Sequence, residues 1–165
     1  MQIMPLAGRR ATLFLAPLNA AMVEFSIDTP LRRASFLAQV GHESGQLRYV
    51  RELASGAAYE GRADLGNVIA GDGVRFKGRG LLQVTGRANY AACGVALGLD
   101  LLAAPQLLEQ TFFACRSAGW FWQSRGLNRL ADADDQERVT RRINGGVNGL
   151  AERLALYQAA RKVLA

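Results

Sequence analysis

Apolar residues near the start of the chain recur at the spacing of an α-helix. They are Phe14, Leu18, Met22 and Phe25. Because residues three and four apart share one face of a helix, this pattern predicts a helix over about 9–25. Pro17 interrupts the pattern, and it either bends this helix or marks its true start.

A second predicted helix has signals at both ends. Asp28-Thr29-Pro30 offers an N-cap residue followed by proline at the first helical position. Apolar positions then follow at helical spacing: Leu31, Phe36, Leu37 and Val40. Gly41 and Gly45 indicate where the helix ends, so we expect Glu43 in its last turn.

The helical pattern is lost between residues 52 and 80, which hold seven of the eighteen glycines and few large apolar side chains. We expect long ordered loops there, with one short pair of strands at most. Side chains such as Asp64 and Phe76 are not typical of a flexible linker. Long ordered loops in small domains usually carry function, so this segment is expected to line a binding site.

Helical patterning returns after the loops and continues to the end of the chain. Residues 81–85 fit a short strand or the start of a helix, and a helix is predicted over 87–97. Pro105 is expected to open another helix, followed by helices over 132–143, with acidic residues early and arginines late, and over 149–164. The expected centre of the core is Phe112, Phe113, Cys115, Trp120, Phe121 and Trp122. The predicted class is a mainly α fold.

Length and composition indicate one globular domain. The 165 residues are enough for one core and too few for two domains of ordinary size, so we expect a single domain over 1–165. No apolar run reaches the roughly 18 residues that a membrane span requires, and we expect no stable membrane insertion. The best candidate for a signal peptide, residues 11–22, contains Pro17 and Asn19 and lacks a cleavage site. We therefore expect folding in a cytoplasm.

The few cysteines and histidines restrict the chemistry. Cys93 and Cys115 cannot build a disulfide scaffold or a four-thiolate zinc site, and we expect two buried free thiols. His42 is the only histidine, so any Ser-His-Asp triad would have to include it. We expect no metal and no cofactor.

The net charge of +6, with eighteen arginines and two lysines, favours a polyanionic partner. Nucleic acid, an anionic membrane surface and a bacterial wall all fit this sign. Aromatic residues are not interleaved with the arginines and no DNA-binding motif is present, so nucleic acid is not expected. The run Gly73–Gly80 is not a phosphate loop, because Arg79 and Gly80 stand where lysine and serine or threonine are needed.

Glu43 and Glu52 are candidates for acid–base cleavage of a glycosidic bond, which needs one protonated and one ionised carboxyl group. A continuous helix would separate them by about 13 Å along its axis. The pairing therefore requires the helix to stop after Glu43 and the chain to fold back. The alternative is a pair of ordinary salt bridges with Arg48 and Arg51.

Several polar residues have both a functional and a structural interpretation. Glu60 is the rival second carboxylate, with Asp64 and Asp72 behind it, although Asp72 between two glycines fits a turn. His42 either orients Glu43 or is an ordinary hydrogen-bonding residue near a helix end. Four neutral residues either form caps and turns or hold a sugar and the attacking water: Gln83, Thr85, Asn89 and Asn144.

Four motifs, in this order, resemble glycoside hydrolase family 19, and its phage endolysin branch more than the plant chitinases. They are Phe36–Ser44, Phe76–Thr85, Asn89-Tyr90 and Ile143–Gly146. The resemblance extends from about residue 10 to the end of the chain. It implies a lysozyme-like α fold, with the loop-rich segment lining a deep substrate cleft, and an inverting mechanism without a metal.

The resemblance also implies roles for individual residues. Glu43 matches the general acid, Glu52 the general base, and Thr85 the hydroxyl residue that helps to hold the attacking water, with Glu60 as the alternative base. The residues expected to bind substrate or to lie beside the acid are His42, Tyr59, Gln83, Asn89, Asn144 and Arg153. The chain departs from the chitinases at Thr85, where they usually have serine, in a shorter loop segment and in lacking their disulfide cysteines.

The function implied is that of a phage or prophage endolysin that cuts β-1,4 bonds of peptidoglycan. Chitinase activity is the enzymatic alternative, and a sugar-binding wall protein is the non-enzymatic one. We expect a monomer without a separate wall-binding module, held in the host cytoplasm until a holin releases it to the periplasmic wall. Peptidoglycan strands are its expected partner.

Overall fold

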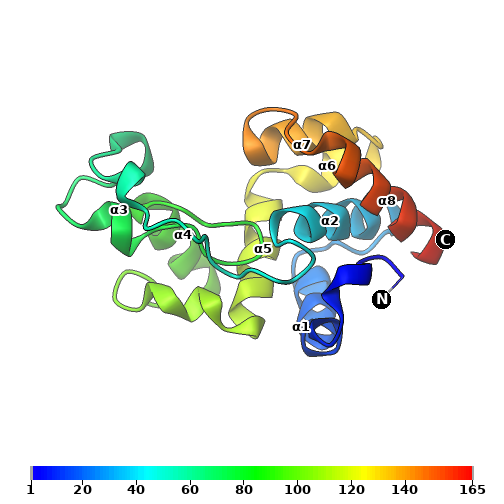
Figure 1. Ribbon diagram of the computed structural model, residues 1–165, viewed down its shortest axis with the longest axis horizontal. Helices are drawn as coiled ribbons and strands as arrows, with labels where there is room; N and C mark the ends of the chain where they lie inside the picture. The colour runs from blue at the N-terminus through cyan, green and yellow to red at the C-terminus, as the bar shows by residue number, and fades with distance from the viewer. Residues whose placement is uncertain (1, 165) are drawn as a thin grey trace.

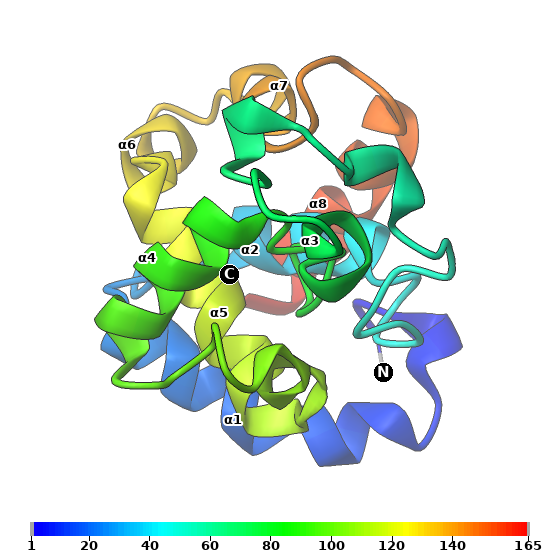
Figure 2. The ribbon, with the colours of Figure 1, turned by 90° about the vertical axis from the view of Figure 1, so that its left-hand side faces the viewer.

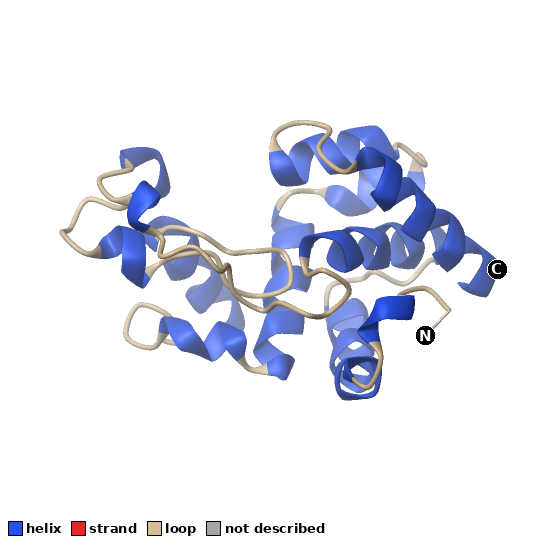
Figure 3. Ribbon diagram, in the orientation of Figure 1, coloured by secondary structure: helices blue, strands red, loops and turns tan. Residues whose placement is uncertain are grey.

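The computed structural model describes residues 2–164, which are mainly helical (Figure 3). Eight α-helices occur in this part of the chain: α1 Arg10–Glu24, α2 Pro30–Glu43, α3 Asp72–Arg75, α4 Arg87–Leu97, α5 Thr111–Ser124, α6 Leu127–Asp132, α7 Gln136–Asn144 and α8 Leu150–Leu164. Four short 3-10 helices lie between them: η1 Pro5–Ala7, η2 Ala57–Tyr59, η3 Ala63–Leu65 and η4 Pro105–Glu109. The expectation of a mainly α domain is confirmed.

Helix α5 is the central element. It contacts α1, α4, α6 and η4. In Figure 1, helices α2, α6, α7 and α8 lie to one side of α5, and α3 and α4 lie to the other with the loop-rich segment. Figure 2 views the molecule from the side of α3 and α4. The candidate site described below takes its residues from both sides of α5.

The core is centred on Trp122 of α5, which is fully buried. Its ring meets the ring of Phe36 edge to face, with the centroids 5.4 Å apart and the planes at 85°. The expected aromatic centre holds for Phe121 and Trp122, but it is wrong for Phe112, whose side chain is 49% exposed. Phe112 lies across the helix from the buried positions, so spacing within a helix outweighs aromatic character here.

Helices α2 and α8 approach closely because small residues line their contact. Ala34 and Ala38 of α2 pack against Leu156 and Ala160 of α8. A Cβ atom on Gly41 would lie 3.1 Å from Cδ1 of Leu156, so a larger residue there would require the Leu156 side chain to shift. This contact brings the first turns of α8 beside the last turn of α2.

The predicted N-terminus of α2 is confirmed. Thr29 is the N-cap, its Oγ1 accepts a hydrogen bond from the backbone N–H of Arg32 at 3.2 Å, and Pro30 occupies the first helical position. Helix α1 contains Pro17 in its interior, so Pro17 does not mark its start.

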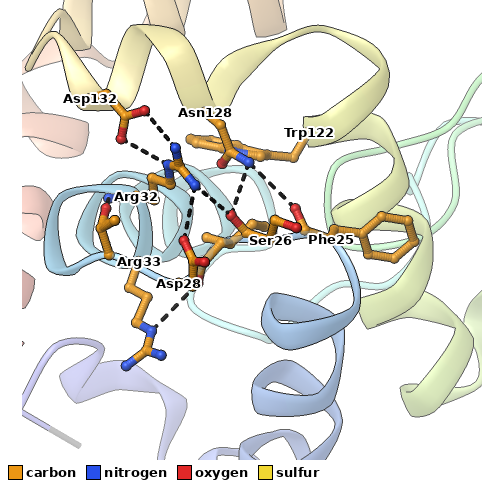
Figure 4. A network of polar contacts seen from close by, with 10 residues as sticks. Phe25, Ser26, Asp28, Arg32, Arg33, Trp122, Asn128 and Asp132 are labelled. Atoms are coloured by element: carbon orange, nitrogen blue, oxygen red, sulfur yellow. Dashed lines mark hydrogen bonds and ion pairs between the residues drawn. The ribbon is translucent and has the colours of Figure 1, made fainter.

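A polar network joins α2 to α6 (Figure 4). Arg32 donates to both carboxylate oxygens of Asp132, at 2.8 and 2.7 Å, and to Oδ1 of Asp28 at 2.9 Å. Asn128 accepts a hydrogen bond from the indole N–H of Trp122 at 2.8 Å and donates to the carbonyl of Ser26 at 3.0 Å. The network fixes the turn between α1 and α2, and so the position of α2.

Three expected boundaries are corrected. The segment predicted as one helix over 132–143 is divided, because Asp134 adopts a left-handed conformation with φ 55° and Asp135 caps α7 through the backbone N–H of Arg138. Pro105 opens the 3-10 helix η4, and the following α-helix begins at Thr111. Residues 81–85 form turns rather than a strand or the start of a helix. The possible strand pair is replaced by two isolated bridges, of Arg79 with Arg51 and of Arg79 with Val84.

Candidate active site

Glu43 is the last residue of α2, as the pattern of apolar residues and glycines predicted. The helix stops because the next residues leave the helical conformation: Gly45, Gln46 and Leu47 all have φ between 56° and 68°. Such left-handed conformations are unfavourable for the side chains of Gln46 and Leu47. Ser44 supports the turn, since its hydroxyl donates to the carbonyl of Val40 at 2.6 Å and accepts from the N–H of Leu47 at 2.8 Å.

Arg153 of α8 holds the carboxylate of Glu43. Its guanidinium donates to Oε1 of Glu43 at 2.5 Å, to Oε1 of Gln39 and to the carbonyl of Asn148 at 3.1 Å. The side chain of Arg153 is only 2% exposed, so these bonds compensate the cost of burying its charge. Among residues 2–164, no hydrogen bond to Oε2 of Glu43 occurs. One oxygen is anchored, and the other is available to a substrate.

His42 lies beside the acid but faces α8. Its Nδ1 is 2.7 Å from Oε2 of Glu152. A Cβ atom on Gly149 would lie 2.1 Å from Cε1 of His42, so the imidazole packs directly against the backbone there. His42 therefore connects the end of α2 to the start of α8.

The chain folds back between Glu43 and Glu52. The backbone N–H groups of Arg48 and Tyr49 both donate to the carbonyl of Ser44, each at 2.9 Å. Three residues of extended chain span at most about 11 Å, so the backbone of Glu52 stays within that reach of Tyr49. The chain therefore turns between Ser44 and Tyr49, directly after Glu43.

Glu52 lies on a short stretch of chain paired with the segment at Gly78. Its backbone N–H donates to the carbonyl of Gly78 at 3.0 Å, and Tyr59 donates its hydroxyl to Oε2 of Glu52 at 2.9 Å. Burial, followed by the hydrogen bond to Glu52, raises the pKa of Tyr59, so the phenol keeps the proton that it donates. Oε1 of Glu52 is buried and has no hydrogen-bond partner among the described residues. A buried carboxylate oxygen without a partner is costly, and a bound water would satisfy it.

Gly78 brings three of the expected site residues together. A Cβ atom at this position would lie 2.5 Å from Oε1 of Gln83, and 3.2 Å from both Oε2 of Glu52 and Oγ1 of Thr85. The three polar side chains therefore converge on one point, which only glycine leaves open. Thr85 donates its hydroxyl proton to the carbonyl of Gln83 at 3.1 Å, so its lone pairs remain to accept from a water.

The rival carboxylates are occupied elsewhere. Glu60 accepts hydrogen bonds from the backbone N–H groups of Gly71 and Gly73 at 2.6 and 2.8 Å, and so ties its own loop to the start of α3. Asp64 pairs with Arg62 at 2.6 Å. Asp72 is almost fully buried and pairs with Arg87 at 2.6 Å, which lowers the pKa of Asp72. Of these four carboxylates, Glu52 alone has an oxygen without a hydrogen-bond partner among the described residues.

The remaining neutral residues have hydrogen bonds to nearby backbone. Gln83 donates to the carbonyl of Gly80 at 2.9 Å, and Asn89 donates to the carbonyl of Thr85 at 2.7 Å. Asn144 accepts from the N–H of Gly146 at 2.8 Å and donates to the carbonyl of Asn148 at 3.2 Å. Gln83 and Asn89 thus belong to the group around Glu52, whereas Asn144 shapes the loop that also carries a carbonyl partner of Arg153.

The alternative interpretation, salt bridges of Glu43 and Glu52 with Arg48 and Arg51, finds no such ion pair among the described residues. Glu43 pairs with Arg153, and Arg51 lies 3.4 Å from Glu109. The sequence interpretation missed Gln39, which is 1% exposed and holds Arg153. The sequence does contain an indication of this role. Gln39 is a polar residue one turn before Glu43, on the apolar face of the helix.

Nowhere in residues 2–164 are three or more His, Cys, Asp or Glu side chains arranged to hold an ion. Burial raises the pKa of both Cys93 and Cys115 to about 12, so neither is a thiolate at neutral pH. The arrangement can perform proton transfer with two carboxyl groups.

Proteins with similar sequences are glycoside hydrolases. The sequence profile of chitinase class I glycoside hydrolases matches residues 24–134. A glycosyl hydrolase family 19 domain-containing protein of Haemophilus influenzae is 34% identical, over 78% of this chain and 78% of that protein. An endochitinase of Arabidopsis thaliana is 36% identical, but the match covers 68% of this chain and only 39% of the longer plant protein.

Solved structures are similar over most of the chain. Chitinase C from Streptomyces griseus superimposes with a TM-score of 0.76 at 25% identity, covering 90% of this chain and 83% of that one. A class IV chitinase from Zea mays gives 0.72 at 26% identity, covering 90% and 78%. Fold and sequence together define an enzyme of the chitinase-like glycoside hydrolase class. The chain belongs to glycoside hydrolase family 19.

Proposed function

We propose that the chain is an endolysin that hydrolyses β-1,4-glycosidic bonds of bacterial peptidoglycan with inversion at the anomeric carbon. The observation that carries the mechanism is the pair of differently held carboxylates. Glu43 keeps one oxygen free of hydrogen bonds beside the buried Arg153. Glu52 keeps Oε1 without a partner among the described residues, while its Oε2, bound by Tyr59, lies near Oγ1 of Thr85. Two carboxyl groups with room for a water between them are what inverting glycosidases use.

Glu43 acts as the general acid. Its proton passes to the glycosidic oxygen as the bond from that oxygen to the anomeric carbon breaks, and the bonding electrons stay on the oxygen. Arg153 keeps the carboxyl group in place through this step and stabilises the carboxylate that the step leaves behind.

Glu52 acts as the general base. It takes a proton from a water whose oxygen attacks the anomeric carbon from the face opposite to the leaving group. Tyr59 fixes one oxygen of Glu52, and the hydroxyl of Thr85, close to the same carboxylate, accepts the second hydrogen bond of this water. Gln83 and Asn89, at the edge of the same group, hydrogen-bond the sugar.

The net charge of +6 supports peptidoglycan as the substrate. A basic enzyme is attracted to a wall polymer that carries peptide carboxylates, and a neutral polymer offers no such attraction. The neutral polymer chitin is the second candidate, because several similar proteins are named endochitinases and the same two carboxylates would cleave it.

One experiment separates these substrates. Purified peptidoglycan and N-acetylglucosamine oligomers are digested in parallel, and the products are identified by mass spectrometry. Reducing-end N-acetylmuramic acid from peptidoglycan, released faster than oligomers are cut, is the expected result. Anhydro ends, free peptides or cleavage of the oligomers alone would contradict the proposal. Glu43→Gln serves as the inactive control, and Asp64→Asn as the active one.

A further inference from the structure

A second concave surface lies away from the proposed catalytic residues. This apolar groove has a volume of about 660 Å³ and runs between the N-terminal segment, α1 and the end of α8. Its walls include Ile3, Met4, Leu15, Leu18, Val23 and Val163. None of Glu43, Glu52 and Thr85 lines it. In Figure 1 its elements lie on the side of the molecule opposite to α3 and α4.

Helix α1 exposes apolar side chains along this groove. Leu15 is 62% exposed and Val23 is 74% exposed, and Val163 of α8 is 44% exposed. The helix carries no charged residue from Ala11 to Val23. Helix α1 packs against α5 on one side, and Leu15 and Val23 are exposed on another. The outer face therefore lacks a partner within the described residues.

The charges around the groove that have no ion-pair partner among residues 2–164 are positive, because the nearby Glu24 is paired with Arg116. Arg33 lines it, Arg9 precedes α1, and Lys162 is next to Val163, whereas no aspartate or glutamate lines it. No ion pair to these three cations occurs within residues 2–164. An apolar surface edged by cations is complementary to a layer of anionic lipids, whose acyl chains lie behind phosphate groups.

We propose that this groove and the outer face of α1 dock on the surface of an anionic phospholipid bilayer. Leu15, Val23 and Val163 enter the boundary between head groups and acyl chains, and the groove accommodates an acyl chain. Arg9, Arg33 and Lys162 contact lipid phosphates. Binding is peripheral, because none of the described helices has the length and apolar content that spanning a bilayer needs.

A second copy of the chain is a poorer occupant of the same face. A symmetric dimer places the same patch on both sides of the interface, so the cations of one copy would approach those of the other. Like charges facing one another disfavour association, whereas lipid phosphates neutralise them.

The test uses vesicle sedimentation with the whole chain. Vesicles of phosphatidylglycerol and phosphatidylcholine are compared with vesicles of phosphatidylcholine alone. The chain is expected to bind the anionic vesicles and not the neutral ones. Val23→Glu and Leu15→Glu are expected to weaken binding about tenfold or more, since each places a carboxylate at the head-group boundary.

Val95→Glu is the matched control. Val95 is 87% exposed on α4, outside the groove, and its replacement changes the net charge equally. It should leave binding nearly unchanged, and all three variants should still cut chitin or peptidoglycan fragments as the parent chain does. Equal loss of binding by Val95→Glu would mean attraction by net charge alone and would overturn the proposal. So would binding to neutral vesicles alone, or a dimer in solution that Val23→Glu dissociates without affecting vesicle binding.

Discussion

Tyr59 shows how one residue prepares the proposed base. Its hydroxyl donates to the oxygen of Glu52 that faces Gly78, which leaves the other oxygen buried and without a protein partner. The side chain therefore determines which oxygen can receive a proton from water. A donor fixed in this way acts on Glu52 rather than on the substrate.

Replacing Tyr59 by phenylalanine tests this positioning role. The variant loses one hydrogen bond to a charged group, roughly 1.5 kcal/mol, so kcat is expected to fall about tenfold while KM changes little. Initial rates on N-acetylglucosamine or peptidoglycan fragments measure both constants. Tyr49→Phe is the control, because the hydroxyl of Tyr49 makes no hydrogen bond within the described chain. A rise in KM at constant kcat would instead assign Tyr59 to sugar binding.

At the scale of residues, the sequence pattern predicted the position of Glu43, and the family resemblance implied that Arg153 lies near it, as the structure shows. The end of α2 at Glu43 followed from apolar spacing and glycines, because both are local signals. The partners of Arg153 could not follow from spacing, since Gln39 and Glu43 are more than a hundred positions away from it. Glu60 remained a rival until the structure placed its carboxylate on the backbone of Gly71 and Gly73.

Among the helices, α2 carries Glu43, the proposed acid, and is held at both ends. The network around Arg32 and Asn128 fixes its start, and Arg153 fixes its end. Burial of Trp122 requires a partner for its indole N–H, and Asn128 supplies it. The orientation of α2 therefore depends on contacts from α6 as well as α8.

Asn128→Ala tests the contribution of the start of α2. The indole N–H of Trp122 loses its acceptor inside the core, so the free energy of unfolding should fall by about 2 kcal/mol. Urea denaturation followed by tryptophan fluorescence measures this change. Gln123→Ala, on the exposed side of α5, should have little effect. A loss equal in both variants would show that the network does not stabilise the core.

The ion pair between Asp72 and Arg87 links α3 to α4 and predicts an acid-dependent stability. The pKa of Asp72 is lowered in the folded protein by its bond to Arg87, so the unfolded chain binds the proton more readily. The pair therefore stabilises the fold above the unfolded pKa of about 3.9 and loses this effect as pH falls through the folded value. Asp72→Asn should lower stability at pH 7, and the difference from the parent chain should shrink on acidification. A difference that is constant with pH would contradict the pairing.

The division of the segment 132–143 shows what helical patterns cannot decide. Its dipole signals were correct for α7, with Glu137 early and arginines late, but the helix began four residues later than predicted. Asp135 is a preferred N-cap residue, but Asp132 and Asp134 are equally suitable by type, so composition does not choose among the three. The cap becomes visible only when the backbone of Asp134 is left-handed, which depends on the packing of α6 against α7.

The net charge is a property of the whole molecule, and it leads to a prediction about the effect of salt on wall digestion. If attraction to the wall depends on the net charge of +6, added salt must weaken this attraction. The electrostatic screening length shortens from about 10 Å at about 0.1 M salt to about 3 Å at about 1 M. The rate of wall digestion should fall several-fold over this range, whereas cleavage of a neutral oligomer should not change. Turbidity loss and product release, measured at the same salt concentrations, provide the comparison. Equal salt dependence of both reactions would remove the electrostatic argument for peptidoglycan.

In the proposed mechanism Glu43 and Glu52 act as acid and base, and the configuration at the anomeric carbon is inverted. Proton NMR of the first product observes this configuration. Spectra are recorded during the first minutes of digestion, before the anomers equilibrate. We expect the parent chain to form new reducing ends in the α configuration, and the folded variants Glu43→Gln and Glu52→Gln to form none. Products that first appear as the β anomer, or activity retained in either variant, would contradict it.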